Sequence, residues 1–342
     1  MTKSRSLKQV AVSNFKNKKI LLLGAGFMGR EYCKTLHHLG FSEVTVICNS
    51  LKSANLIRAD FGFIAFDGGY QKNHSHISKK FDLTILSLPI PMLLKGLETL
   101  ILLGHKKILV EKPVALSSIK LSTFIKKHLS SKKSLVKTAF NRMAYPAFLE
   151  LKRRVAQDKG ITSCSYTFTE WPHAIDFSKN NQDVYYKWGL SNSLHVISLA
   201  HALIGLPKKW SCYRSRSLKW HPSGAVFTGS GVTKKNIPFS YHADWVSAGR
   251  WSLTVMTRKH AYRLMPLEEL YICKKKNTVW EPVNYTKETS GIKEGISEEI
   301  ISMLEPNSLK EIKLPDLKRT LAYVKVAEKI FGYEKDKKAK CQ

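Results

Sequence analysis

The feature that most constrains the fold is a glycine turn between an expected strand and an expected helix. The apolar segment 18–23 predicts a buried strand, residues 29–39 predict a helix, and Gly24-Ala25-Gly26-Phe27-Met28-Gly29 joins them. In this setting Gly24 permits the tight turn, Gly26 lets the backbone approach a pyrophosphate, and Gly29 lets the helix pack closely. The start of a helix also offers unpaired N–H groups. The pattern predicts a dinucleotide-binding turn, the alternative being an ordinary glycine-rich turn.

The alternation of strand and helix continues through the first half of the chain. Further strands are expected at residues 43–48, 62–66, 83–88 and 107–110, and helices at residues 92–103 and 117–128. Short apolar strands joined through helices pair in parallel with right-handed crossovers. We therefore expect an arm over residues 1–17, followed by an α/β domain with a doubly wound parallel sheet over residues 18–145.

The second half has a different character. Aromatic and Ser/Thr-rich segments with hairpin spacing predict strands at residues 162–171, 210–220, 225–232, 238–245, 251–257 and 261–264. Helices are expected at residues 146–158, 192–204 and 317–331. The pattern predicts an α+β domain with an open, mainly antiparallel sheet over residues 146–334, and a charged tail over residues 335–342.

The end of the second expected strand indicates the type of cofactor. An acidic residue there would accept hydrogen bonds from the adenosine ribose, but this sequence has Cys48-Asn49-Ser50-Leu51-Lys52 and no carboxylate. Asn49 and Ser50 are able to bond a 2′-phosphate that Lys52 would neutralise. NADP is therefore favoured over NAD, although a Lys52 that only points to water would fit the same sequence.

A polar pair ends the expected strand at residues 107–110. Glu111 and Lys112 come directly after it, where ligands sit in open α/β sheets. Lys112 beside a nicotinamide is able to move the proton of a substrate hydroxyl; the alternative is a surface ion pair. The Lys112–Pro113 bond is a candidate for the cis form.

Four motifs together carry a family resemblance. They are residues 24–29, Val-Glu-Lys-Pro at 110–113, Phe140-Asn141-Arg142 with Tyr145-Pro146-Ala147-Phe148, and Asn192-Ser-Leu-His195. In order and spacing the chain resembles the glucose-fructose oxidoreductase, inositol dehydrogenase and MocA family over residues 18–334. The resemblance implies a Rossmann domain and an α+β domain whose sheet mediates homodimer or homotetramer contacts. It also implies NAD(P)-dependent redox chemistry at a secondary carbinol of a sugar, cyclitol or sugar nucleotide.

The resemblance assigns roles to individual residues. Lys112 matches the family's catalytic lysine and His195 its histidine, both at the reacting hydroxyl, while Glu111 and Asn141 are expected beside the cofactor. Leu88 and Pro89 match the turn under the nicotinamide. Many members carry Asp four residues before the histidine, where this chain has Ser191. Either Lys112 and His195 suffice, or Asn192 supplies orientation alone.

Weaker expectations concern the substrate. Trp171, Tyr186 and Asn192 lie in segments where relatives contact substrate, and aromatic rings suit a sugar; packing under a loop is the alternative. Arg250 and Trp251 are expected mainly as sheet packing or subunit interface. No spacing of histidines, cysteines and carboxylates indicates a metal site.

Composition indicates which binding partners and which cellular location to expect. The net charge of +30 is spread evenly along the chain, which favours solvated surface lysines over a nucleic-acid footprint, and such a field attracts anionic ligands. No apolar stretch predicts a membrane span or an export signal, and the six cysteines lack disulfide or zinc spacing. We expect a cytoplasmic protein. Two other functions stay open: a redox-inactive dinucleotide-binding sensor or scaffold, and nucleic-acid binding.

Overall fold

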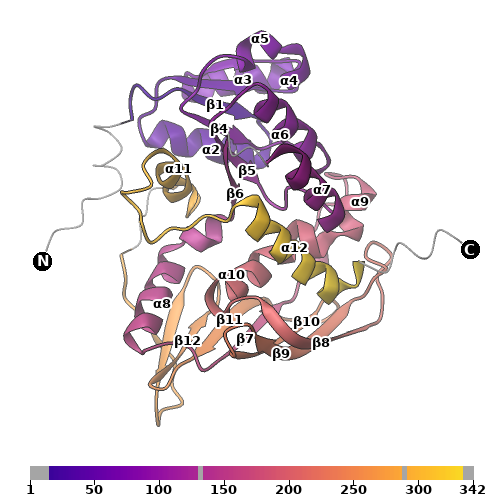
Figure 1. The fold of residues 1–342 in the computed structure, drawn as a ribbon, viewed down its shortest axis with the longest axis vertical. Coiled ribbons are helices and arrows are strands. Elements are labelled where there is room, and N and C mark those ends of the chain that lie inside the picture. Colours follow the sequence, from indigo (N-terminus) through magenta and orange to yellow (C-terminus); the bar gives the residue numbers. More distant parts are fainter. Residues whose placement is uncertain (1–14, 130–133, 287–290, 334–342) are drawn as a thin grey trace, which may run out of the picture. The chain divides into compact units, whose positions relative to one another are not determined.

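The computed structural model describes residues 15–129, 134–286 and 291–333 (Figure 1). The expected tail, and residues 1–14 of the expected arm, lie outside these ranges. By contacts the described chain forms two compact units. The first contains residues 15–115, 119–129, 134–144 and 291–318, and the second contains residues 116–118, 145–286 and 319–333.

The first unit is built on a six-stranded parallel sheet in the order β3-β2-β1-β4-β5-β6. The strands are β1 (Ile20–Leu23), β2 (Val44–Ile47), β3 (Ile64–Phe66), β4 (Leu83–Leu86), β5 (Lys107–Glu111) and β6 (Leu135–Ala139). The predicted doubly wound sheet is confirmed. Between β1 and β4 the strand order reverses, and in open α/β sheets ligands bind at such a reversal, beyond the carboxyl ends of the strands.

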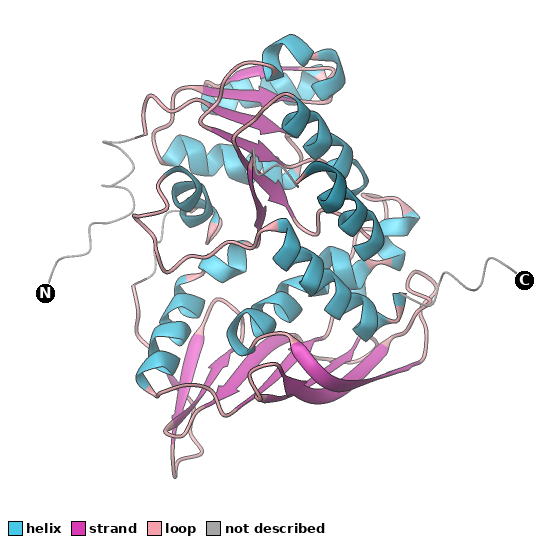
Figure 2. Cartoon of the chain, in the orientation of Figure 1, coloured by secondary structure: helices cyan, strands magenta, loops and turns pink. Residues whose placement is uncertain are grey.

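Helices flank this sheet (Figure 2). They are α2 (Phe27–His38), α3 (Leu51–Phe61), α4 (Gly69–Lys72), α5 (His74–Ile77), α6 (Leu93–Leu102), α7 (Ser118–His128) and α11 (Ile296–Leu304), with short 3-10 turns at Ile90–Met92 and Asn141–Ala144. Helix α6 contacts β4 and β5, and α11 contacts α2 and β5. The sequence did not predict α3, α4, α5 or α11, and it did not predict β6.

The chain returns to the first unit near its end, which differs from the predicted domain boundaries. We expected all of residues 146–334 in the second domain, whereas residues 291–318 group with the first. The backbone N–H of Thr138 donates to the carbonyl of Pro315 at 2.8 Å, and Lys107 Nζ donates to the carbonyl of Leu304 at 3.0 Å. These contacts join segments that lie far apart in sequence, so local patterns gave no sign of them.

The second unit has an eight-stranded sheet in the order β14-β13-β12-β11-β7-β10-β9-β8. The strands are β7 (Ser163–Phe168), β8 (Pro207–Ser215), β9 (Val226–Thr233), β10 (Pro238–Asp244), β11 (Trp251–Met256), β12 (His260–Leu264), β13 (Leu270–Lys274) and β14 (Glu281–Pro282). All pairs are antiparallel except β7 with β10. The expected open, mainly antiparallel sheet is confirmed, with β13 and β14 as additions.

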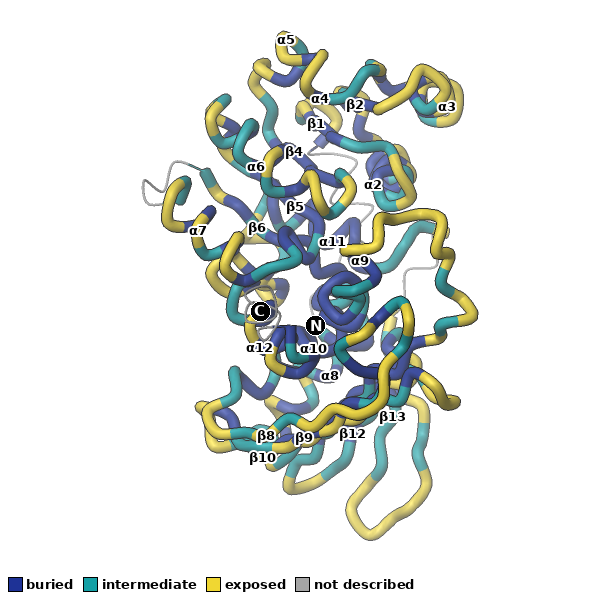
Figure 3. Tube along the Cα trace, turned by 90° about the vertical axis from the view of Figure 1, so that its right-hand side faces the viewer, coloured by how far each residue is buried: buried dark blue, intermediate teal, exposed yellow. Residues whose placement is uncertain are grey.

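The helices of this unit are α8 (Pro146–Gln157), α9 (Gln182–Tyr186), α10 (Leu194–Ile204) and α12 (Leu317–Phe331), with a 3-10 turn at Pro172–Ala174 and a π-helical turn at Gly189–Ser193. Helix α10 lies on β7 and β11 and is buried on nearly all sides (Figure 3). Its sequence, LHVISLAHALI, is apolar all round, as such a position requires. The start of α10 is thereby held rigidly against the centre of the sheet.

Candidate functional site

Two glycines of the turn after β1 are sterically required. Gly24 has φ +98°, and a Cβ on it would overlap the carbonyl oxygen of Ser87, which follows β4. A Cβ on Gly29 would overlap the carbonyl oxygen of Gly24. Only glycine therefore allows β1, α2 and the end of β4 to approach as they do.

Among the residues that the structure describes, none requires a glycine at position 26, because a Cβ there would meet no described atom within 4 Å. Gly26 is the N-cap of α2, with no side-chain cap hydrogen bond, and the first turn of the helix carries no acidic residue. An open, uncapped helix start at the reversal of strand order is what a diphosphate needs, because the helix N–H groups and partial positive charge both favour an anion. The site fits a dinucleotide.

The residues expected around this turn lie at the start of α2 and at the ends of β2 and β4, the two strands that flank β1. Asn49 and Lys52 are exposed after β2, while the Ser50 hydroxyl caps α3 by accepting from the Ser53 N–H at 3.3 Å. Leu88 is half-buried and Pro89 exposed after β4. Phe27, at the start of α2, is 74% exposed, and Met28 is half-buried. These positions leave the side chains of Asn49 and Lys52 available to a ligand.

The end of β5 carries the predicted Glu111 and Lys112. Glu111 is buried and accepts a hydrogen bond from the Tyr32 hydroxyl at 2.9 Å. Burial raises the pKa of Glu111, although the positive charge of Lys112 acts in the opposite direction. Lys112 is half-buried, and the Lys112–Pro113 bond is cis, as the sequence suggested.

The residue after Pro113 is conformationally strained. Val114 is fully buried and has φ +70°. A β-branched residue rarely adopts this conformation, and such strain persists only where the surrounding structure enforces it. The backbone that follows Lys112 is therefore fixed rather than free to relax.

The returning segment 291–304 adds residues that sequence patterns did not reveal. Lys293 Nζ lies 5.0 Å from the centre of the Phe27 ring, and its charge lowers the pKa of Glu111. The Asn141 amide donates to the carbonyl of Glu294 at 3.1 Å, so this expected cofactor residue also anchors the segment. Lys293 thus places a cation beside Phe27, in the turn after β1.

Glu299 on α11 is an unusual part of the same unit. It is fully buried, and neither carboxylate oxygen has a hydrogen-bond partner among the residues that the structure describes. Burial, followed by the negative charge of Glu111, raises the pKa of Glu299 well above its ordinary value. The two carboxyl groups and the Tyr32 hydroxyl form a buried acidic cluster behind the end of β5.

In the second unit, His195 lies in the first turn of α10, directly after the π-helical turn. It is 7% exposed, and its ring centre lies 6.1 Å from that of Trp251. Ser191 is buried and its hydroxyl donates to the carbonyl of Val184 at 3.1 Å. Helix α10 begins at Leu194, two residues later than expected. Isolated π-turns of this kind occur frequently at functional sites.

A buried carboxylate stands close to this helix start, although position 191 is serine. Glu170, just after β7, accepts from the Ser193 hydroxyl at 2.6 Å and from the Asn192 amide at 2.8 Å, one bond on each carboxylate oxygen. Burial raises the pKa of Glu170, while these hydrogen bonds and the charge of Arg250 lower it. Sequence reasoning missed Glu170, yet it is the one carboxylate between residues 159 and 175, in a segment rich in aromatic, Ser and Thr residues.

Aromatic and cationic side chains form a row that ends at His195. Ring centres of His173 and Trp171 are 5.8 Å apart, and the Arg250 Cζ lies 4.4 Å from the centre of the Trp171 ring and 4.9 Å from that of Trp251. We name His173, Trp171, Arg250, Trp251 and His195 the Arg250 row. The structure thus brings together the expected Trp171, Asn192 and His195, whereas the Tyr186 hydroxyl accepts from Gln182 on its own helix.

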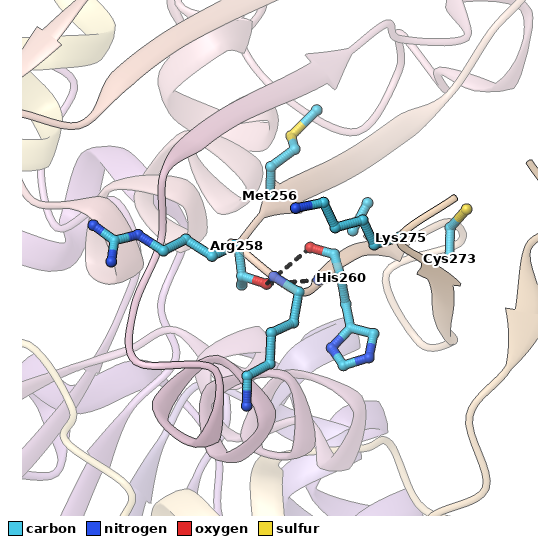
Figure 4. A pocket seen from close by; sticks show the side chains of 8 residues that line it. Met256, Arg258, His260, Cys273 and Lys275 are labelled. Atoms are coloured by element: carbon cyan, nitrogen blue, oxygen red, sulfur yellow. Dashed lines mark hydrogen bonds between the residues drawn. The ribbon is translucent and has the colours of Figure 1, made fainter. Parts of the chain in front are cut away.

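A shallow hollow of about 500 Å³ lies at the turn between β11 and β12, lined by Met256, Thr257, Arg258, Lys259, His260, Ala261, Cys273 and Lys275 (Figure 4). It is at the opposite end of β11 from Trp251 and contains no expected site residue. Asp158 Oδ2 accepts there from Thr257, His260 and Tyr262, each at 2.8 Å. These bonds hold the hairpin in place.

The described ranges contain neither a metal-ligand group nor a membrane-spanning helix. No group of three or more His, Cys, Asp or Glu side chains is arranged there as metal ligands would be. Within the same ranges, none of the helices is long and apolar enough to cross a membrane.

Comparisons with known proteins concern the fold. The profile of the shikimate/quinate 5-dehydrogenase family matches residues 6–88. No curated protein matches the chain in sequence. Among solved structures, UDP-N-acetylglucosamine 3-dehydrogenase from Acidithiobacillus ferrooxidans has a TM-score of 0.70 at 15% identity, with 92% of this chain and 97% of that chain covered.

Two further structures are similar over the same extent. Levoglucosan dehydrogenase in complex with NADH and L-sorbose has a TM-score of 0.71 at 14% identity, covering 92% of this chain and 96% of that one. Biliverdin reductase from Synechocystis sp. PCC 6803, in complex with biliverdin and NADP+, has a TM-score of 0.67 at 12% identity, covering 92% and 98%. The chain therefore shares its whole two-domain fold, a parallel Rossmann-type sheet with a second, mixed sheet, with these dehydrogenases and reductases.

Proposed function

We propose that the chain is an NAD(P)-dependent oxidoreductase of the glucose-fructose oxidoreductase, inositol dehydrogenase and MocA family. It would transfer a hydride to or from a secondary alcohol carbon of a sugar, cyclitol or sugar nucleotide. The observation that carries this proposal is the open, uncapped start of α2 at the reversal of strand order, where Gly26 leaves room for a diphosphate. Solved structures of the same fold contain NADH or NADP+.

The first unit would hold the cofactor. The turn Gly24–Gly29 would donate its N–H groups to the diphosphate, and Asn49, Ser50 and Lys52 would receive the ribose end. The absence of a carboxylate from residues 48–52 favours NADP, because an acidic side chain there would repel a 2′-phosphate. When bound, the nicotinamide supplies the hydride chemistry.

Lys112 would move the proton of the reacting hydroxyl. It follows a buried strand, and the surrounding structure holds the buried, strained Val114 two residues after it. General acid–base catalysis of this kind typically contributes about 10²–10⁴-fold to the rate. His195 on the second unit would position the substrate oxygen, and the rigid setting of α10 against its sheet suits that task.

Glu170 supplies a carboxylate close to position 191, where this chain has serine in place of the family's aspartate. The family's aspartate would lie on the same helical face as the histidine, and here a carboxylate from the loop after β7 binds Asn192 and Ser193 instead. We propose that Glu170 is a positioning residue that holds the start of α10, and with it His195. This arrangement favours a working enzyme over the redox-inactive sensor that Ser191 alone suggests.

Several expectations are carried forward as proposals. We propose a first domain over residues 18–145 that binds the cofactor and a second over residues 146–334 that binds substrate, with residues 291–318 packed on the first. The homodimer or homotetramer would form through the second sheet, whose strand β10 alternates buried and exposed residues. Cytoplasmic location and the lack of nucleic-acid, metal and membrane partners stay predictions.

The test is hydride transfer by Lys112→Met. NADPH absorbance is followed with a panel of sugars, cyclitols and sugar nucleotides. The matched control is Lys95→Met, which changes an exposed lysine on helix α6. We expect Lys112→Met to bind NADPH as the wild type does and to lose at least about 100-fold in kcat, while Lys95→Met keeps full activity. Equal turnover by both variants would remove Lys112 from the mechanism.

The sensor alternative is separated by the same panel. A sensor binds the dinucleotide and shows no substrate-dependent change in NADPH or NADP+ absorbance, whereas the enzyme shows such a change with at least one substrate class. The same assay tests the role of the Glu170 carboxylate. If the chain is an enzyme, we expect Glu170→Ala to abolish its turnover.

A further inference from the structure

The Arg250 row leads from the protein surface to the buried His195. Trp171 is 41% exposed, Arg250 is half-buried, and Trp251 is 4% exposed. The indole N–H of Trp171 donates to the carbonyl of Gly249 at 2.6 Å, which fixes this ring on the loop between β10 and β11 that carries Arg250. The row is thus held by loops that follow β7 and precede β11.

The guanidinium of Arg250 is oriented by two indole rings. It lies over both rings, at 4.4 Å from the centre of Trp171 and 4.9 Å from that of Trp251. Contacts of this type use the face of a guanidinium and leave its edge N–H groups to other partners. Those edge groups are the donors that bind phosphate and carboxylate in pairs.

The Arg250 guanidinium makes no hydrogen bond or ion pair with any residue that the structure describes, and it lies over the two indole rings. Glu170 interacts with it through the electrostatic field, but the Glu170 oxygens are occupied by Asn192 and Ser193. An oriented arginine with unused donors is therefore placed one indole ring away from His195.

We infer that Arg250 binds an anionic group of the substrate, which is a phosphate or a carboxylate. The guanidinium that binds this anion is itself held between Trp171 and Trp251. This inference rests on the proposed function for the identity of the substrate site, and it narrows the substrate class. Sugar phosphates, sugar nucleotides and sugar acids are expected to bind, in preference to neutral sugars and cyclitols. The overall charge of +30 would draw such anions toward the protein.

Binding is measured without cofactor, by quenching of tryptophan fluorescence. The probes are glucose 1-phosphate, glucuronate and methyl glucoside, which distinguish a phosphate, a carboxylate and a neutral sugar. We expect the wild type to bind glucose 1-phosphate or glucuronate more tightly than methyl glucoside. Arg250→Leu should weaken binding of the anionic probe at least about tenfold, and Arg250→Lys should weaken it less because the charge is kept.

The matched control is Arg258→Leu, an exposed arginine at the other end of β11. It should bind all probes as the wild type does. If Arg250→Leu does not fold, judged by circular dichroism, Arg250→Lys carries the test. Equal binding of the anionic probes by the wild type and Arg250 variants, or no binding of either anion, would overturn the inference.

The two proposals fail in different ways. Loss of anion binding in the Arg250 variants, without hydride transfer from any probe by the wild type, would support the anion site and contradict the oxidoreductase. Turnover of neutral sugars that Arg250→Leu leaves unchanged would support the oxidoreductase and contradict the anion site.

Discussion

The turn after β1 and the start of α10 are built in different ways. The first is made of backbone: Gly24 and Gly29 allow close packing, and Gly26 leaves an open helix start. The second is made of side chains, because Glu170 binds Asn192 and Ser193 from another element. A backbone site is specified by a short sequence pattern, whereas a side-chain site depends on segments that meet only after folding.

The largest expected effect lies within the glycine turn. Gly24→Ala would create an overlap with the Ser87 carbonyl at φ +98°, so we expect it to lower the free energy of unfolding by on the order of 3 kcal/mol. Gly26→Ala is the control and should change stability by less than about 0.5 kcal/mol, because nothing lies within 4 Å. Urea unfolding measures both. Similar losses for the two variants would contradict a turn in which only Gly24 is required.

The sequence predicted the backbone site more completely than the side-chain site. The glycine turn, the strand end at Lys112 and the helix carrying His195 follow from local periodicity and motif spacing. Lys293, Glu299 and Glu170 could not be placed in the same way. Their partners come from other elements, and the residues next to each of them in sequence do not indicate which distant segment it will meet.

Glu170 provides the corresponding test of the side-chain site. Glu170→Ala would leave the buried Ser193 hydroxyl and the Asn192 amide without their acceptor, and we expect unfolding free energy to fall by about 2–3 kcal/mol. The exposed Glu43→Ala should lie within about 0.5 kcal/mol of the wild type. If thermal and urea unfolding show Glu170→Ala as stable as Glu43→Ala, the carboxylate does not hold this helix start.

Acid should affect the second unit through two buried histidines. His201 donates from Nδ1 to the Gly205 carbonyl, and His221 donates from Nδ1 to the Gly224 carbonyl. Burial lowers the pKa of each to about 4. The unfolded chain, with an ordinary histidine pKa near 6.5, therefore binds more protons between these values, and stability falls as the pH is lowered.

From pH 7 to pH 5 this contribution is roughly 2 kcal/mol for each histidine. We expect His221→Gln to lose about that much of the pH dependence of unfolding, measured with urea at the two pH values. In the first unit the pKa values of Glu111 and Glu299 are raised, so the folded chain binds more protons at these residues than the unfolded chain does. Their contribution to stability therefore increases as the pH is lowered, opposite to that of the histidines. An unchanged pH dependence in His221→Gln would show that His221 titrates normally in the folded protein.

The smallest expected effect concerns Glu299, which differs in its contacts from the buried Glu170. Glu299 lacks the hydrogen bonds that Glu170 has, and it faces the charge of Glu111. Removing its ionisable group should therefore stabilise the protein, so we expect Glu299→Gln to raise the free energy of unfolding by about 1 kcal/mol at pH 8. Calorimetry at pH 8 measures the change. A destabilised Glu299→Gln would indicate that this carboxylate is held by interactions that matter for the fold.

The central claim is that a nicotinamide dinucleotide lies with its diphosphate on the start of α2. Its direct test is a titration of the wild type and Gly26→Ala with NADPH and NADH, followed by nicotinamide fluorescence. The account predicts saturable binding at one site per chain, tighter for NADPH, and weakened at least about tenfold by the added methyl group of Gly26→Ala. Absence of saturable binding, or equal affinity of the two proteins, would contradict it.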